Sequence, residues 1–556
     1  MKVRLPTIVQ DPASTEIAGK TENFEVREDE EDVFLDGPVS RRVAVIDFDE
    51  KTGLPRPGVV FEPPAPGRTL AGYPLADPHD YTARDFNAVS VFATVLRTLR
   101  LFESADCLGR RLEWGFGGPQ LLVVPRAGLR ANAFYSRDSR SLQFFFFPSS
   151  VPEHEGRTIY TSLSHDIVAH ETGHAILDGI APDLYDALTP QSLALHEAIA
   201  DLTALLMAYG SRTLAASVLE KTRGSIDRPS DFSWLAEEFA SAKDGGRSGY
   251  LRSLDNQKTF DSEDRSRDAH GRRNFVRERA DPHRQSQVLT GALYPAMLAL
   301  FDHYRQAEQE ETGKTSYSVS GKALAVAAQH FKRVVLRGLD YLPPGEVSFA
   351  DYARAILASD EAYYASDRPA VRQQIRDELV RRRVVASARD LEVATNVDPE
   401  EHPSIGELDL DRLVESDWAA YDFVDRHREL LGVPPGVPFH VKPRQKVRKV
   451  YFRGGRRVPK RECLLKVSWD VREPNGGAPE VASERQITAG TTLALAWSSR
   501  HAPRIRALLR SDASKPETDA AGEQRADRDL MMRSLVESEE RPGGDAHDSA
   551  TLRLER

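Results

Sequence analysis

Two histidines and two glutamates stand in an order and spacing that suit a metal ion and the activation of water. The run His170-Glu171-Thr172-Gly173-His174 places its histidines four residues apart, so on a helix both rings lie on one face. Glu197 follows after 22 intervening residues and offers a third ligand. Two imidazoles and a carboxylate are typical ligands of catalytic zinc, which keeps one position open for water. The pattern therefore predicts a Zn²⁺ site with Glu171 beside it.

The alternative is that His170 and His174 only line an exposed helix face. The surrounding residues favour a buried helix, because Ser164 and Asp166 can cap its start and apolar residues continue on both sides of the motif. Burial matters for the chemistry, since fixed ligands leave one open position at which water loses a proton near neutral pH.

A second apolar helix is expected at about residues 191 to 209, and it carries Glu197 and Asp201 four residues apart. Both carboxylates then face the same way. Asp201 is placed to accept the second ring N–H of a ligand histidine, which would hold the ring in one tautomer. The alternative for Asp201 is an acid on the helix surface, but two carboxylates in an otherwise apolar stretch are unusual.

The motifs occur in an order that resembles the thermolysin-like gluzincin zinc metallopeptidases. The resemblance covers roughly residues 81 to 360, about half of the chain. The matching segments are Asn132-Ala133-Phe134-Tyr135, residues 166–175 around the two histidines, Tyr185, residues 197–201, Leu251-Arg252-Ser253 and His283.

The resemblance implies that His170, His174 and Glu197 bind one catalytic Zn²⁺ and that Glu171 is the general base. It also implies that Tyr185 and His283 donate hydrogen bonds to the oxyanion that develops during attack on a peptide carbonyl. Losing either donor should reduce turnover more than substrate binding, because the charge exists only in the transition state. The expected activity is hydrolysis of internal peptide bonds of a polypeptide substrate.

The same resemblance assigns substrate contacts. Asn132 and Ala133 match the edge strand to which an extended peptide adds through main-chain hydrogen bonds. Arg252 matches an arginine that holds the substrate carbonyl beyond the scissile bond, with a structural salt bridge as the alternative. Ile167 and Leu251 match positions that favour an apolar residue after the cut.

Some positions depart from the family pattern. A calcium ion near Asp166 and Glu238 fits the resemblance, but the paired calcium site of the family is not expected, because non-acidic residues replace several of its acids. These are Ala208, Ser233 and Leu235. His196 stands where the family usually has asparagine. Asp281 lies only two residues before His283, which leaves open which acid orients that histidine.

Composition fits a soluble enzyme: 556 residues, 40% hydrophobic, with a formal net charge of −10 and no apolar run long enough to span a membrane. The first residues lack the apolar core of a signal peptide, so we expect a cytoplasmic protein, with leaderless export as the alternative. Cys107 and Cys463 alone give no disulfide framework. Room for a full pro-domain is missing before Asn132, so we expect control from elsewhere, such as latency or a regulatory protein partner.

The expected fold is α+β, with a two-lobed thermolysin-like catalytic domain and a small C-terminal β-rich module. We expect the cleft between an α/β lobe and a helical lobe. The predicted regions are an N-terminal extension with a β-hairpin (1–80), the α/β lobe with the histidine helix (81–180), the helical lobe (181–360), a helical and acidic linker (361–440), the β-rich module (441–508) and a disordered tail (509–556).

The stretch 442–461 holds ten Lys or Arg residues and no acid. Solvated strands of an accessory domain are expected there rather than a nucleic-acid contact, because aromatic residues are few and the chain is acidic overall. Two other functions compete with the endopeptidase. A catalytically silent binding or scaffold protein has no use for Glu171, and a zinc aminopeptidase would need an acidic site near the edge strand, which residues 132–135 do not supply.

Overall fold

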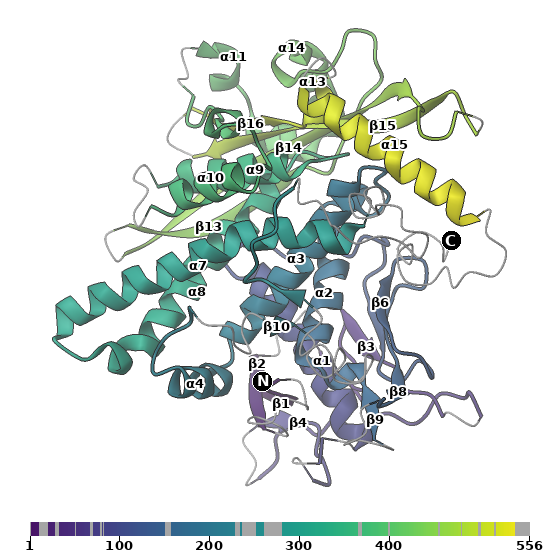
Figure 1. Ribbon diagram of the computed structural model, residues 1–556, viewed down its shortest axis with the longest axis vertical. Helices are drawn as coiled ribbons and strands as arrows, with labels where there is room; N and C mark the ends of the chain where they lie inside the picture. Colours follow the sequence, from purple (N-terminus) through teal and green to yellow (C-terminus); the bar gives the residue numbers. More distant parts are fainter. Residues whose placement is uncertain are drawn as a thin grey trace, which may run out of the picture.

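The computed structural model describes most of the chain. The described residues are 2–10, 20–27, 33–49, 52–66, 70–77, 80–81, 83–150, 157–227, 234–235, 252–260, 281–364, 370–397, 401–453, 456–479, 481–498, 502–515 and 519–539. The fold is mixed α and β, in agreement with the α+β class expected from the sequence (Figure 1).

A four-stranded sheet in the order β3-β5-β7-β6 forms the first layered unit. Its strands are β3 (Val43–Val45), β5 (Leu121–Val124), β6 (Ala133–Ser136) and β7 (Ser141–Phe144). The first three in spatial order run parallel, and β6 pairs antiparallel with β7 and forms one edge. Helix α1 (Arg84–Glu103) packs beside β3 and against the helix that carries the two histidines. The sheet therefore brings an edge strand next to the histidine helix.

The N-terminal residues form a smaller sheet and differ in part from the expected hairpin. Strand β1 (Lys2–Ile8) pairs antiparallel with β2 (Thr21–Arg27) and parallel with β4 (Ala71–Gly72). The turn near residues 49 to 57 is closed by a bridge between Phe48 and Pro55. The apolar run at 43–45 pairs with β5 and is not part of an N-terminal hairpin, because Val43 and Val45 join the main core.

Long helices fill the centre of the molecule. They are α2 (His165–Ile180), α3 (Pro190–Tyr209), α4 (Arg212–Lys221), α7 (Pro282–Thr312), α8 (Ser316–Tyr341), α9 (Phe349–Glu361) and α10 (Val371–Arg381). Helix α7 starts where the Asp281 side chain caps the His283 N–H and where Pro282 needs no partner, and it ends at Gly313 with φ 68°. Helix α3 packs between α2 and α7, so residues of all three helices can meet.

The C-terminal β-rich unit is a sheet in the order β12-β14-β15-β16, with β13 also paired to β14. Its strands are β12 (His440–Val441), β13 (Gln445–Arg453), β14 (Arg456–Pro474), β15 (Glu484–Trp497) and β16 (Arg504–Arg510). One face packs on the main core through Val447 and Leu464, and the other forms a second core through Cys463 and Trp469. The alternation along β14 explains the two-sided burial.

Two regions differ from their sequence-based description. The expected linker at 361–440 contributes short helices whose apolar residues build the second core with the sheet; they are α11 (Pro403–Gly406), α12 (Leu410–Glu415), α13 (Asp417–Arg426) and α14 (Arg428–Leu431). The expected disordered tail contains α15 (Asp519–Glu539), which crosses beside β15 (Figure 1). Buried Arg528 ties α15 to Glu473 at 2.7 Å and to Thr189 at 2.9 Å. The ion pair with Glu473 and the hydrogen bond to Thr189 hold α15 against distant parts of the chain, although the polar composition of this segment predicted disorder.

Short strands complete the described elements: β8 (Phe146–Pro148) with β9 (Thr158–Tyr160), and β10 (Trp234–Leu235) with β11 (Arg252–Ser253). Within the described part of the chain, no single helix has the length and apolar composition needed to cross a membrane. Helices α3 and α4 meet that test only as a pair bent by 82°.

Candidate metal centre

Helices α2 and α3 bring the predicted ligands together because they pack closely. Gly173 lies at their crossing, where an added Cβ would sit 3.1 Å from the Ala200 Cα and from the Thr203 hydroxyl. The lack of a side chain at Gly173 therefore permits the close approach of the two helices. All of α3 is buried, so Glu197 projects from the core toward α2.

His170, His174 and Glu197 form a compact cluster in which one ligand atom from each residue lies within 4.8 Å of the others. The two Nε2 atoms are 3.0 Å apart, and the Glu197 carboxylate oxygens lie 3.5 Å from His170 Nε2 and 3.4 Å from His174 Nε2. The Glu197 side chain is only 2% exposed. Two imidazole nitrogens and one carboxylate converging inside a core make a donor set that suits a transition metal such as Zn²⁺.

Each ligand histidine has a partner for its second ring nitrogen. Asp201 Oδ1 lies 3.0 Å from His170 Nδ1, which is the contact that the spacing on α3 led us to expect. His196 Nδ1 lies 2.6 Å from His174 Nδ1, and the two rings stack at a centroid distance of 4.9 Å. Burial lowers the pKa of His196 to about 4, so this ring is neutral and its Nδ1 can accept a hydrogen bond from the His174 Nδ1–H. Both imidazoles are thus held with Nε2 directed at the cluster.

Glu171 lies beside the cluster and is oriented by the edge strand. Its Oε2 accepts a hydrogen bond of 3.1 Å from the Tyr135 backbone N–H in β6. The residue is 8% exposed, so it is close to the surface of the site without being freely solvated. A backbone donor on a sheet edge fixes the carboxylate next to the place where an extended chain could pair with β6.

His283 reaches the same cluster from the start of α7. Its Nε2 lies 3.4 Å from Glu197 Oε2, and its side chain is 44% exposed. Asp281 Oδ1 lies 3.6 Å from His283 Nδ1 and also accepts the His283 backbone N–H at 3.0 Å. Asp281 therefore both caps α7 and stands beside the imidazole.

Tyr185 lies next to these residues in an aromatic and ionic network. Its ring is 6.1 Å from the His196 ring, and the Arg137 guanidinium lies 4.3 Å above it. Burial raises the pKa of Tyr185, and the backbone of Arg137 hydrogen-bonds its hydroxyl. Arg137 also donates to both oxygens of Asp178, at 3.1 and 3.0 Å. The network holds the Tyr185 loop against α2 and the end of β6.

The predicted substrate contacts lie on two separate sheets. Ala133 is the first residue of the edge strand β6, and Asn132 precedes it with its side-chain oxygen accepting the Ala133 N–H at 3.0 Å. Arg252 lies in β11, which pairs with β10. The roles predicted for all three stay predictions.

The predicted calcium ligands are only partly described. Asp166 is buried and accepts a hydrogen bond of 3.0 Å from Gln10. Glu238, Ser233 and Leu251 lie outside the described residues. Among the described residues, the cluster of His170, His174 and Glu197 is the group of His, Cys, Asp or Glu side chains that could hold a metal ion.

Sequence reasoning missed three residues that shape the centre: Tyr135, Arg137 and Asp178. Asp178 is the fourth residue after His174, so it continues the same face of α2, and this spacing could have indicated it. It is fully buried and accepts the Tyr135 hydroxyl at 2.7 Å. The contribution of Tyr135 through its backbone N–H has no side-chain signal in the sequence.

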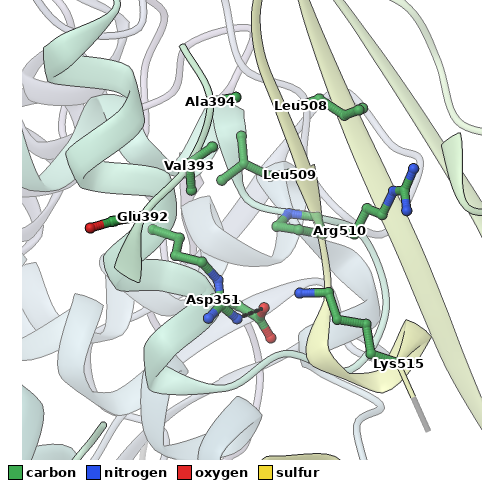
Figure 2. Close-up of a pocket in the computed structure, with 10 residues that line it drawn as sticks. Asp351, Glu392, Val393, Ala394, Leu508, Leu509, Arg510 and Lys515 are labelled. Carbon is green, nitrogen blue, oxygen red and sulfur yellow. Dashed lines mark hydrogen bonds and ion pairs between the residues drawn. The ribbon is translucent and has the colours of Figure 1, made fainter. Parts of the chain in front are cut away.

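One described pocket, of about 190 Å³, lies elsewhere, between α9 and β16 (Figure 2). Its polar wall includes Arg354, which pairs with Asp351 at 2.6 Å and with Asp512 at 2.5 Å. Burial and the neighbouring Asp512 raise the pKa of Asp351. This ion-pair group joins the C-terminal sheet to α9 and contains none of the metal-centre residues.

Comparison of the chain with protein-family models and with curated proteins gives no match.

Proposed function

We propose that the protein is a zinc-dependent endopeptidase with the two-lobed catalytic fold of the thermolysin-like gluzincins. One observation carries the proposal: a buried cluster of two histidines and a glutamate lies beside Glu171, whose carboxylate is fixed by the edge strand β6. A binding protein needs the metal ligands for stability at most, whereas a carboxylate held next to the ligand helix face by a backbone N–H suits general-base catalysis.

In this proposal His170, His174 and Glu197 hold the metal ion. When bound, Zn²⁺ acts as a Lewis acid that polarises a carbonyl and makes water more acidic. Asp201 and His196 fix the tautomer and the orientation of the two imidazoles by accepting hydrogen bonds from their Nδ1–H groups. The protein thereby supplies a rigid set of ligands before substrate arrives.

Glu171 takes the proton from the attacking water and delivers it to the leaving amine nitrogen. The hydrogen bond from the Tyr135 N–H to Oε2 positions the carboxylate for this transfer. A substrate lying along β6 would present its carbonyl next to Glu171, because pairing with the edge strand runs through main-chain groups. This mode of binding favours extended polypeptides over folded ones.

His283 and Tyr185 complete the proposed site as donors to the developing oxyanion. His283 is exposed enough to meet substrate and close enough to Glu197 to face the reacting carbonyl. Tyr185 lies beside His196 and under the Arg137 guanidinium. In this proposal its hydroxyl is the second donor to the same carbonyl.

The test is cleavage of an internally quenched peptide with both ends blocked, by full-length protein loaded with Zn²⁺. Glu171→Gln keeps the size of the side chain and removes the base, so turnover should fall about 1000-fold while zinc content is unchanged. A chelator should abolish cleavage and added zinc should restore it.

Three outcomes would contradict the endopeptidase. Unchanged turnover in Glu171→Gln would remove the general base. Bound zinc without cleavage of blocked or unfolded substrates would favour a binding protein. Cleavage only of peptides with a free amino terminus would favour an aminopeptidase.

A further inference from the structure

Tyr185 lies in the connection between the two ligand helices. Residues 181–189 join the end of α2 to the start of α3, and their regular structure is one 3₁₀ turn, Pro182–Leu184. Tyr185 follows that turn, and its N–H donates to the Pro182 carbonyl at 3.2 Å. A connection with so few hydrogen bonds of its own takes its position from the residues that contact it. Besides Arg137, three groups from distant parts of the chain do so.

The first group is Lys442, which follows β12. Its Nζ lies 2.8 Å from Asp183 Oδ1, and Asp183 Oδ2 accepts the Gly345 N–H at 3.0 Å. The Lys442 side chain is 30% exposed and that of Asp183 is 24% exposed, so the pair is partly shielded from water. Asp183 stands two residues before Tyr185, and both of its carboxylate oxygens are thus bonded to groups outside the loop.

The second group is Arg528 of α15. It donates from Nε and Nη2 to the two oxygens of Glu473, at 2.7 Å each, and from Nη1 to the Thr189 hydroxyl at 2.9 Å. The fork to Glu473 fixes the plane of the guanidinium, so its remaining donor is directed at Thr189. Arg528 and Thr189 are both buried, and Thr189 stands four residues after Tyr185.

Glu346 is the third group, and it links the loop to the C-terminal sheet. Its Oε1 accepts the Leu188 N–H and its Oε2 accepts the Thr189 N–H, each at 2.8 Å. Its own backbone N–H donates to the Thr488 carbonyl of β15 at 2.7 Å. Glu346 is buried, so one residue inside the protein bonds both to the loop and to the sheet.

These contacts lie on both sides of Tyr185, and each of the three groups belongs to the C-terminal unit or is bonded to it. By the C-terminal unit we mean β12 to β16 together with α15. Lys442 and Arg528 lie beyond residue 360, outside the part of the chain that resembles the metallopeptidases. A donor to an oxyanion must be correctly placed, because a displacement of about 1 Å can cost about 100-fold in rate. The placement of the Tyr185 hydroxyl therefore depends on residues of the C-terminal unit.

We propose that the C-terminal unit controls the activity of the metal centre by holding the Tyr185 loop, with Lys442 and Arg528 as positioning residues. The inference rests on the proposed endopeptidase function and concerns the regulation of that site. Neither side chain contacts the reacting atoms. Each acts through the loop, which keeps the Tyr185 hydroxyl available to the developing oxyanion. Loss of either contact lets the loop leave this position, so turnover falls while substrate binding along β6 persists.

Turnover of the blocked, internally quenched peptide by zinc-loaded, full-length protein tests the catalytic part. Lys442→Met keeps the length of the side chain and removes its charge. A partly exposed ion pair supports about a fivefold bias in loop position, so kcat should fall about fivefold, with KM within about twofold of wild type. Lys442→Arg keeps the charge and should retain the wild-type kcat. The matched control, Lys446→Met, should also retain it, because Lys446 pairs with Asp411 of α12 at 2.9 Å.

A second substitution tests whether Lys442 acts through Tyr185. Tyr185→Phe removes the hydroxyl, so kcat should fall about 100-fold. In that background no hydroxyl is left to position, and Lys442→Met should change kcat by less than about twofold. A general loss of structure would instead lower kcat by the same factor in both backgrounds.

Hydrogen exchange followed by mass spectrometry reports on the loop without any need for catalysis. The amides of Leu188 and Thr189 are bonded to Glu346, so they exchange when the loop opens. Peptides covering residues 181–189 should exchange at least about fivefold faster in Lys442→Met and Arg528→Met than in wild type. The control variants Lys446→Met and Arg525→Met should exchange like the wild type.

Three results would overturn the inference. They are equal kcat values for Lys442→Met and Lys446→Met, the same factor of loss with and without the Tyr185 hydroxyl, and unchanged exchange of residues 181–189 in both Lys442→Met and Arg528→Met. Failure of the proposed function gives a different pattern. The zinc-loaded wild type would not cleave the peptide, although exchange would still respond to the substitutions, and the catalytic use of these contacts would be refuted together with the endopeptidase.

Discussion

The contact between His174 and His196 predicts how strongly the candidate metal centre would hold zinc in the proposed function. The two Nδ1 atoms are 2.6 Å apart, and His196 is 1% exposed. Removing the acceptor would leave the His174 Nδ1–H buried without a partner. Loss of such a contact typically weakens metal binding 10- to 100-fold, or about 1.4 to 2.7 kcal/mol.

The substituted side chain must leave no space for a water molecule, because a water could accept the His174 Nδ1–H in place of His196 and mask the loss of zinc affinity. His196→Leu has a similar size, offers no acceptor and leaves little space for a water molecule, so we expect a loss near the upper end, about 100-fold. His196→Asn keeps an oxygen that can accept the same proton, so its affinity should stay within about threefold of wild type.

The assay is competition for Zn²⁺ between the protein and a chromogenic chelator of known affinity. His165→Leu is the control, because His165 is as buried as His196 and its ring nitrogens have no hydrogen-bond partner among the described residues. It should leave zinc affinity nearly unchanged. Unfolding of the zinc-free variants, followed by circular dichroism, separates lost metal affinity from lost folding.

The reasoning would be refuted if His196→Leu bound zinc as tightly as wild type. Equal losses in the leucine and asparagine variants would also refute it, because they would show that packing, rather than the accepted proton, matters at this position.

Three further predictions concern stability, each measured by urea unfolding. Arg528→Met should lower the unfolding free energy by about 3 kcal/mol, because it breaks a buried ion pair with Glu473. Arg525→Met removes a partly exposed arginine that lies 3.5 Å from the same carboxylate, so it should cost less than about 1 kcal/mol. Burial lowers the pKa of Lys466 from 10.5 to about 8, so as the pH rises the folded protein loses this proton before the unfolded chain does. The unfolding free energy of wild type relative to Lys466→Met should therefore rise by about 3 kcal/mol between pH 8 and 10.5. Gly173→Ala should cost about 1 to 3 kcal/mol and weaken zinc binding by separating α2 from α3, while Gly321→Ala, with open space at its Cβ, should be neutral or stabilising.

Each of these predictions has a contrary result. Equal effects of the two arginine substitutions would show that α15 is held by other contacts. A stability difference for Lys466 that does not change across the pH range would mean that the folded protein keeps this lysine protonated. A Gly173→Ala variant with normal zinc affinity would show that the helix crossing tolerates a methyl group.

The helices of the metal centre could be predicted because their information is local. Apolar periodicity predicted helices at 191–209 and around His170, and the structure has α3 at Pro190–Tyr209 and α2 at His165–Ile180. A spacing of four residues is enough to place two side chains on one helix face. The sequence likewise predicted a β-rich module at 441–508, and the structure has β13, β14 and β15 within that range.

The N-terminal hairpin and the tail were described less well for the same physical reason. Which strand Val43–Val45 would join depended on β5, more than seventy residues later, and the order of α15 depends on Arg528 meeting Glu473 and Thr189. Pairing and ion contacts between distant segments leave no periodic trace in the sequence.

The sequence by itself determined the ligand set and its helices: His170, His174 and Glu197 stand where helical geometry makes them converge. Only the tertiary structure determined which residues contact these side chains. It brought the Tyr135 backbone N–H to Glu171 and placed His196 beside His174. Side-chain spacing along one helix is set by covalent geometry, but contacts between helices, sheets and loops are set by how their buried faces pack.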